Sequence, residues 1–270
     1  MKITAGIDVG STATKAVIFD GSILGWSVIP TGWNPKEAGT RVFNEAMERA
    51  GITWEQVDKI IGTGYGRISL PFIDKKVTEI TCHARGAKFL FPETRTVIDI
   101  GGQDSKVIAV DDDGAVADFV MNDKCAAGTG RFLQVMTGVL DITLEELGKL
   151  AAKEEPVPIN AMCTVFAESE IIGLLAQGVS KEAIASGIID TIAKKLLSLT
   201  ARVPCISEIT FSGGVASNPE ICRILSRGLR VRFNVPNEPQ VVGALGAAII
   251  GQEIGGSNHT RRVLNETRDT

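Results

Sequence analysis

The chain has 270 residues, of which 44% are hydrophobic and 22% charged, and a formal net charge of −4. This composition is typical of a soluble globular protein with one large or two medium domains. The small negative charge gives no basis for binding nucleic acid or a membrane surface. We find no apolar run of about 18 residues and no signal peptide, and therefore expect a cytoplasmic protein.

Four strands and two helices are predicted in the first half of the chain, residues 1–94. Apolar runs bounded by turn residues place the strands at 3–9, 14–19, 23–29 and 57–62. The helices are expected at 35–50 and 82–91. Asn34 and Pro35 are typical of a helix start, and Gly51 of a helix end.

The second half, residues 95–250, begins with the same strand pattern and continues with more helices. Strands are predicted at 95–100, 105–110, 115–121, 206–211 and 231–235. Helices are predicted from about Phe132 onward and at 143–153, 165–177, 181–202, 218–228 and 239–250. Residues 251–270 form a polar tail.

The two halves share a sequence pattern at a constant offset of 91 residues. The segment Ile7-Asp8-Val9-Gly10 corresponds to Ile98-Asp99-Ile100-Gly101, and Lys15 corresponds to Lys106. A chance match between two hairpins is the alternative to duplication. Because Asp, Gly and Lys all match, we predict two duplicated β-β-β-α-β-α halves that face each other across a cleft.

Neither the P-loop nor the dinucleotide-binding glycine motif occurs, so phosphate binding would depend on the two acidic hairpins. In each hairpin an aspartate, Asp8 or Asp99, precedes glycine, whose backbone lets N–H groups approach a phosphate. These carboxylates suit Mg²⁺, directly or through water. The alternative is two ordinary hairpins with turn-forming residues. The candidate nucleotide-binding residues are Gly10, Ser11, Thr12, Lys15, Gly101, Gly102, Gly128, Thr129, Gly130, Glu168, Gly213, Gly214 and Val215.

Hydrolysis of a nucleotide would also require a water molecule held near the terminal phosphate. Gln103, in the second hairpin loop, is the residue that we expect to position it. Asp8, Asp99 and Asp104 are expected to serve Mg²⁺ or water. A purely structural loop role is the alternative for Gln103 and Asp104, and helix capping is the alternative for Glu168.

Two of the five cysteines, Cys125 and Cys163, precede apolar segments that resemble helix starts. The partial positive charge at a helix N-terminus favours the thiolate, and two such thiolates are half of a four-sulfur metal site. A two-fold homodimer would supply the other half. Zinc, a disulfide and plain burial are the alternatives. Cys82, Cys205 and Cys222 are expected to be core residues.

Several segments resemble known families. DVGSTATK, DIGGQDSK and FSGGVASN are similar to motifs of the acetate and sugar kinase, Hsc70 and actin superfamily, which implies duplicated ribonuclease H-like α/β domains. Within that superfamily, TGYGR, NDKCAAGTGRF and CTVFAESE resemble ATP-hydrolysing activators of (R)-2-hydroxyacyl-CoA dehydratases. This resemblance covers residues 3–250.

The resemblance implies ATP or ADP with Mg²⁺ in the cleft. It also implies one 4Fe–4S cluster per homodimer, bound by Cys125 and Cys163 of each chain, which agrees with the count of thiolates. The expected activity is ATP-driven transfer of one electron to a 2-hydroxyacyl-CoA dehydratase, with ferredoxin or flavodoxin as the donor. Alternatives are a sugar or carboxylate kinase of the same fold, an ATPase component of a benzoyl-CoA reductase, and a scaffold that does not hydrolyse ATP.

Overall fold

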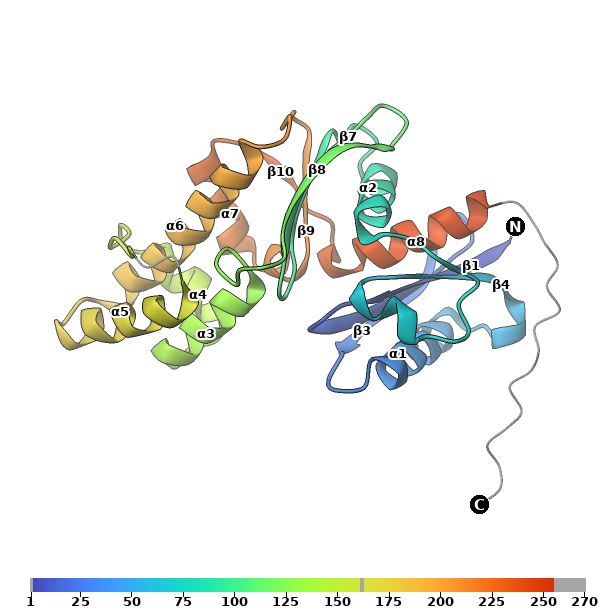
Figure 1. The fold of residues 1–270 in the computed structure, drawn as a ribbon, viewed down its shortest axis with the longest axis horizontal. Coiled ribbons are helices and arrows are strands. Elements are labelled where there is room, and N and C mark those ends of the chain that lie inside the picture. The colour runs from blue at the N-terminus through green and yellow to red at the C-terminus, as the bar shows by residue number, and fades with distance from the viewer. Residues whose placement is uncertain (1, 161–162, 255–270) are drawn as a thin grey trace, which may run out of the picture.

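The computed structural model describes residues 2–160 and 163–254, which form two α/β halves side by side (Figure 1). Each half contains a five-stranded sheet, with strand orders β3-β2-β1-β4-β5 and β10-β9-β6-β7-β8. In both sheets the first three strands of the half are antiparallel, and the next two are added parallel to the first. The predicted duplication is therefore visible in the topology.

The first half contains the elements that were predicted, with small shifts. Its strands are β1 (Ile3–Val9), β2 (Ala13–Phe19), β3 (Ile23–Pro30), β4 (Val57–Thr63) and β5 (Lys75–Lys76). Its helices are α1 (Pro35–Ala50) and α2 (Glu79–Leu90). Asn34 caps α1 and Gly51 ends it at φ +66°, as predicted. Helix α2 begins three residues earlier than predicted because the Thr78 side chain caps it. The two-residue strand β5 was not predicted.

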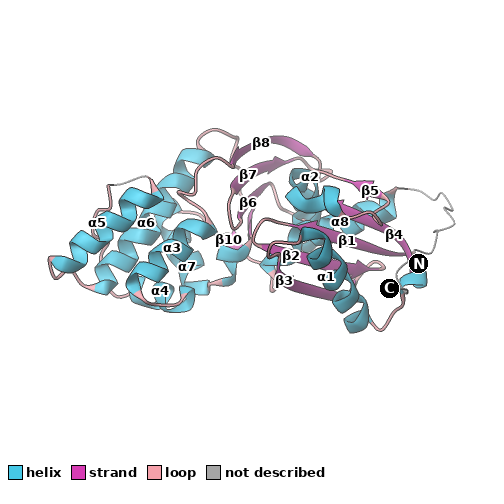
Figure 2. Cartoon of the chain, turned by 60° about the horizontal axis from the view of Figure 1, so that its bottom comes forward, coloured by secondary structure: helices cyan, strands magenta, loops and turns pink. Residues whose placement is uncertain are grey.

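The second half adds a block of helices to the same sheet plan. Its strands are β6 (Thr96–Ile100), β7 (Ser105–Val110), β8 (Val116–Asn122), β9 (Ile209–Ser212) and β10 (Phe233–Asn234). Its helices are α3 (Gly130–Leu140), α4 (Leu144–Ala151), α5 (Thr164–Ala176), α6 (Lys181–Thr200), α7 (Pro219–Leu229) and α8 (Val242–Glu253). Figure 2 shows α3 to α7 gathered on one side of the second sheet.

Two predictions at the C-terminal end need correction. The strands predicted at 206–211 and 231–235 are shorter, because Ile206 bonds to the Thr96 side chain outside the ladder and β10 pairs through two residues alone. Helix α8 continues to Glu253, so the tail predicted from residue 251 begins with helix. Residues 255–270 of that tail lie outside the described residues.

Strand alternation decides which aspartates face the space between the halves. Ile7 and Val9 of β1 pack under α1, so Asp8 between them points to the opposite face. Ile98 and Ile100 of β6 likewise pack against the helical block, which turns Asp99 away from it. The two duplicated aspartates therefore point toward the same interior space.

Each sheet is covered on this inner face by a helix from the other half of the chain. Helix α8 packs on β1 and β2 of the first sheet, and α2 packs on β6 and β7 of the second. The predicted division after residue 94 thus follows the sheets but not these two helices. The helices cross at glycines: a Cβ on Gly246 would lie 1.7 Å from the Cys82 carbonyl oxygen. In the described part of the chain, no helix combines the length and apolar character needed to cross a bilayer.

Candidate functional site

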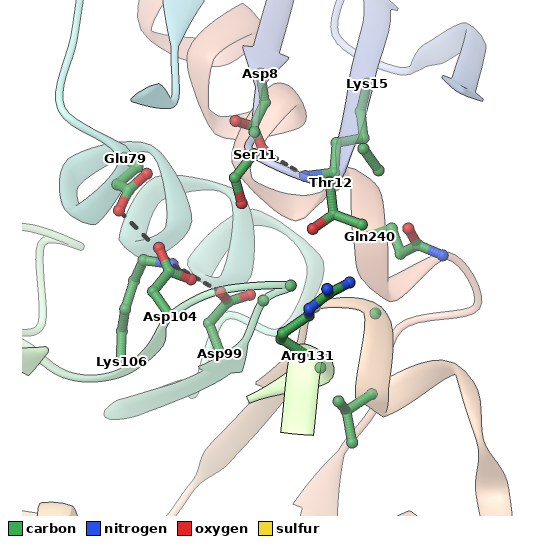
Figure 3. Close-up of a pocket in the computed structure, with 18 of the residues that line it drawn as sticks. Asp8, Ser11, Thr12, Lys15, Glu79, Asp99, Asp104, Lys106, Arg131 and Gln240 are labelled. Atoms are coloured by element: carbon green, nitrogen blue, oxygen red, sulfur yellow. Dashed lines mark hydrogen bonds and ion pairs between the residues drawn. The ribbon is translucent and has the colours of Figure 1, made fainter. Parts of the chain in front are cut away.

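A cleft lies between the two halves, where β1 and β6 end (Figure 3). Both duplicated loops contribute to its walls, and the labelled side chains of both halves point into this common space. Of the residues predicted to bind nucleotide or Mg²⁺, those that line the cleft are Asp8, Gly10, Ser11, Thr12, Lys15, Asp99, Gly101, Gly102, Asp104, Gly130, Gly213, Gly214 and Val215. Most of the predicted site is therefore brought together by the fold.

The two hairpins present the same ion pair in the same register. Asp8 lies opposite Lys15 in the β1–β2 ladder, and Asp99 lies opposite Lys106 in the β6–β7 ladder. The distance from the lysine Nζ to the aspartate Oδ2 is 3.0 Å in both halves. Each lysine thus neutralises and orients a carboxylate at the end of a strand, next to a glycine loop.

A second duplicated feature was missed in the sequence. Gly64 after β4 and Gly213 after β9 both have positive φ, +79° and +89°, and each precedes a short 3-10 helix. A Cβ on Gly64 would lie 2.4 Å from Asp8 Oδ1, and one on Gly213 would lie 3.0 Å from Asp99 Oδ1. The glycines therefore let the backbone pass directly beside each aspartate, which a larger residue would prevent.

Lys106 is the centre of a buried charge cluster in the second half. Its Nζ lies 3.0 Å from Asp99 Oδ2, 2.8 Å from Asp104 Oδ1 and 3.7 Å from Glu79 Oε1. Burial alone would lower the pKa of Lys106, but these carboxylates raise it well above its usual range. Burial opposes ionisation of Asp99, yet His83, Lys106 and the Ser212 hydroxyl hold its pKa well below its usual range.

Glu79 and His83, both on α2, line the cleft but were absent from the predicted site. Burial raises the pKa of Glu79 to about 7, against the opposing attraction of Lys106. Burial also lowers the pKa of His83, whose Nδ1 lies 3.4 Å from Asp99 Oδ1. Thr78 is a typical helix-capping residue. Recognising it in the sequence would have placed Glu79 in the first turn of α2 rather than in a loop. Tyr65 of the TGYGR segment lines the cleft as well. Other lining residues that were not predicted are Ala13, Arg131, Gln134, Leu144 and Gln240.

Four predicted residues do not line the cleft. Gln103 is exposed on the loop between β6 and β7, and Glu168 lies on α5 in the helical block. Gly128 and Thr129 lie just before α3, where Thr129 is buried and caps the helix. Their roles in binding or hydrolysis stay predictions.

Cys125 and Cys163 are exposed free thiols, and each lies beside a helix start, as expected from the sequence. Cys82 and Cys222 are buried as predicted, whereas Cys205 is exposed, so its prediction as a core residue is wrong. Cys163 directly precedes α5, and Cys125 lies in the loop before α3. Among the described residues, no group of three or more His, Cys, Asp or Glu side chains is placed to hold a metal ion. Because both sulfurs are free and exposed, their chemistry fits half of a four-sulfur site, and a second chain would have to supply the other half. The cleft carboxylates fit Mg²⁺ held mainly by nucleotide phosphates and water, which needs only one or two carboxylates.

The decisive comparison is with protein families. The model of the BadF/BadG/BcrA/BcrD ATPase family matches residues 5–251, nearly the whole described chain. This chain belongs to that ATPase family. The (R)-2-hydroxyglutaryl-CoA dehydratase activating ATPase of Acidaminococcus fermentans is 44% identical over 250 residues, which cover 91% of this chain and 95% of the relative. One component polypeptide of the benzoyl-CoA reductase of Thauera aromatica is 32% identical, with 93% coverage of each chain.

Solved structures support the same family assignment. Component A of the Acidaminococcus fermentans (R)-2-hydroxyglutaryl-CoA dehydratase superposes with a TM-score of 0.90 at 42% identity, covering 94% of this chain and 98% of that one. The activator of the 2-hydroxyisocaproyl-CoA dehydratase from Clostridium difficile, solved with bound ADPNP, gives a TM-score of 0.87 at 40% identity, covering 95% and 100%. A glucokinase from Streptomyces griseus, at 14% identity and a TM-score of 0.59, shares the fold alone. The predicted actin-like and sugar-kinase-like fold is confirmed.

Proposed function

We propose that this ATPase is an iron–sulfur activator that passes one electron to a 2-hydroxyacyl-CoA dehydratase at the expense of ATP. The observation that carries the proposal is the pair of exposed thiols, Cys125 and Cys163, beside helix starts in a chain with an ATPase cleft. A phosphotransferase of this fold would need the cleft but would have no use for these thiols. The 44% identity to a dehydratase activating ATPase supports the same activity.

Cys125 and Cys163 would hold a 4Fe–4S cluster together with the same residues of a second chain in a homodimer. Four thiolates is the usual ligand set of such a cluster, and a two-fold axis presents each residue twice. When bound, the cluster supplies a one-electron carrier, with ferredoxin or flavodoxin as the source of the electron. The chain's own contribution is to hold the thiolates at helix N-termini, where negative charge is stabilised.

Within the cleft, the duplicated loops would bind the phosphates of ATP between the halves, with Asp8 and Asp99 oriented toward Mg²⁺ by Lys15 and Lys106. Hydrolysis transfers the terminal phosphoryl group to water, breaks its bond to ADP and releases a proton. Glu79 is the side chain best placed to accept that proton. It lines the cleft, and its pKa of about 7 leaves it ready to be a base near neutral pH.

Iron analysis tests the proposal directly. Protein purified without oxygen should contain about 4 iron and about 4 sulfide per dimer. Cys125→Ser and Cys163→Ser should each lose both together, because each removes two ligands of the shared set. Cys205→Ser is the matched control, since Cys205 is also an exposed free thiol, and it should retain the iron. Iron-free wild-type protein that is dimeric and hydrolyses ATP would contradict the proposal and favour a kinase.

The pH dependence of ATP hydrolysis tests the role of Glu79. Because the base must be ionised, kcat/KM for ATP should rise with pH up to about 7 and then level off, since this ratio reports the free enzyme. Glu79→Gln should remove the rise and lower kcat/KM by about 100-fold or more.

Gln103→Ala is the companion variant, because Gln103 is the residue predicted from the sequence to position water. If Gln103→Ala abolishes turnover while Glu79→Gln leaves the pH profile unchanged, the base assignment is wrong and water positioning by Gln103 is favoured.

A role in a benzoyl-CoA reductase has one observation in its favour, the 32% identity to a component of that enzyme. This role differs from that of an activator in its assembly, because a reductase component works inside a larger complex whereas the proposed activator is a homodimer. Sedimentation of the purified chain distinguishes the two: a stable homodimer favours the activator, and a monomer that needs other polypeptides favours the reductase.

A further inference from the structure

The link between the third strand and the following helix differs between the duplicated halves. In the first half, residues 31–34 connect β3 to α1. In the second half, the longer segment 123–129 connects β8 to α3 and carries Cys125. Cys125 therefore lies on an extension at the place where the first half has a tight connection. We call residues 123–129 the Cys125 loop.

The Cys125 loop is hydrogen-bonded to the phosphate-facing loop of the second half. The carbonyl oxygen of Gly101 accepts from the Gly130 N–H at 2.8 Å. The carbonyl oxygen of Gly102 accepts from the Arg131 N–H at 2.7 Å and from the Thr129 Oγ1 at 3.1 Å. Gly101 and Gly102 thus line the cleft on one side and are hydrogen-bonded to the start of α3 on the other.

Thr129 joins these contacts to the cysteine. Its side chain is fully buried, and its N–H donates to the Ala126 carbonyl at 2.7 Å. On the other side of the loop, the Asn122 side-chain amide donates to the carbonyl of Cys125 at 2.8 Å. The Cys125 loop is thus held at both ends. The Thr129 hydroxyl makes the only described side-chain hydrogen bond from this loop to Gly102.

The phosphate-facing loops of the two halves meet at Gly102. A Cβ added to Gly102 would lie 2.0 Å from the Thr12 Oγ1 of the first half, so the backbone approaches Thr12 closely. Opening or closing of the cleft must change this contact. Gly102 is therefore the point at which relative movement of the halves reaches the hydrogen bonds of Thr129.

We propose that Thr129 is a positioning residue that transmits the nucleotide state of the cleft from Gly102 to Cys125. The inference rests on the proposed function for what Cys125 does, but not for the transmission itself. Movement of Gly102 displaces the bonded Thr129 hydroxyl and the first turn of α3, and the Cys125 loop moves with them.

Hydrogen–deuterium exchange tests the proposal on the anaerobically purified protein, at saturating ADP or ADPNP. In the wild type, amides of residues 123–131 should exchange at rates that differ between the two nucleotides. In Thr129→Val this difference should shrink, because the variant lacks the hydroxyl that bonds to the Gly102 carbonyl. Thr129→Ser, which keeps the hydroxyl, should restore it.

Thr137→Val is the matched control, because the buried Thr137 hydroxyl donates at 3.1 Å to the Gln134 backbone carbonyl within α3 itself and has no described bond to Gly102. It should leave the nucleotide-dependent difference unchanged. Equal exchange of residues 123–131 with both nucleotides in the wild type would overturn the proposal, whether or not any variant folds. So would a Thr129→Val protein that keeps the full difference. Because the readout needs neither iron nor a dehydratase, it can succeed even if the proposed function fails.

Discussion

Replacing Lys106 with methionine should destabilise the protein by about 3–5 kcal/mol, the usual cost of removing one partner of a buried ion pair. The Lys106 side chain is 4% exposed and is the shared cation for Asp99, Asp104 and Glu79. Without it, these carboxylates repel each other in a buried space. Urea unfolding followed by circular dichroism measures the loss.

The duplicated hairpin supplies the control. Lys15 occupies the equivalent position, but its side chain is 16% exposed and its described ion pair is with Asp8 alone. Lys15→Met should therefore cost less than Lys106→Met, because it leaves one carboxylate rather than three without a cation. Equal losses for the two variants would show that the cluster around Lys106 is not the cause.

The sign of the pH dependence gives a second check on Lys106→Met. Loss of the cation raises the pKa of Glu79 further above its value in the unfolded chain, and it raises the pKa of Asp99 from its low value in the folded wild type. The folded variant then binds more protons than the folded wild type, so the stability of the variant relative to wild type should fall as the pH rises from about 5 to about 8. The difference from wild type should consequently be larger at pH 8 than at pH 5.

Gly246→Ala should be the second severe variant, with a loss of about 3 kcal/mol or more. The new Cβ would lie 1.7 Å from the Cys82 carbonyl oxygen and 2.8 Å from the Gly86 nitrogen. Both obstacles are backbone atoms of α2, so no side chain can rotate away and the two helices must separate. The melting temperature should fall accordingly, and nucleotide affinity should fall with it because α2 and α8 support opposite walls of the cleft.

Gly138→Ala is the control for the helix effect of the substitution. Gly138 lies in α3, is exposed and has no atom within 4 Å of an added Cβ. Alanine is the better helix former, so this variant should be stabilised by about 0.5–1 kcal/mol. A Gly246→Ala protein as stable as wild type would mean that α8 can shift freely along α2.

The sequence analysis predicted the duplicated hairpins and most of the cleft because these features are local. Apolar alternation sets the strands, and a fixed offset relates Asp8 and Lys15 to Asp99 and Lys106. Once the strands pair in register, each lysine must lie opposite its aspartate. The relation between Gly64 and Gly213 follows the same logic but was missed, because the residues around them differ.

Features that depend on tertiary packing could not be predicted in this way. No local signal tells α8 to pack on the first sheet or α2 on the second, since an apolar helix face does not specify which sheet it will cover. Glu79 was missed because its role depends on where α2 starts and on which side faces the cleft. Gln103 was preferred for its position in the loop, but a side chain's direction at such a turn is decided by the whole loop.

The position of α8 has a consequence for synthesis of the protein. Thr4 in the first strand donates to the carbonyl of Ala248, and Val17 and Phe19 pack against Leu245 and Ala248. The ribosome must therefore synthesise the chain through Ala248 before this face of the first sheet is covered. At roughly 5–20 residues per second, synthesis of the intervening residues leaves this apolar face uncovered for on the order of ten to fifty seconds. During that interval the nascent chain depends on chaperones or on its own provisional contacts to avoid aggregation.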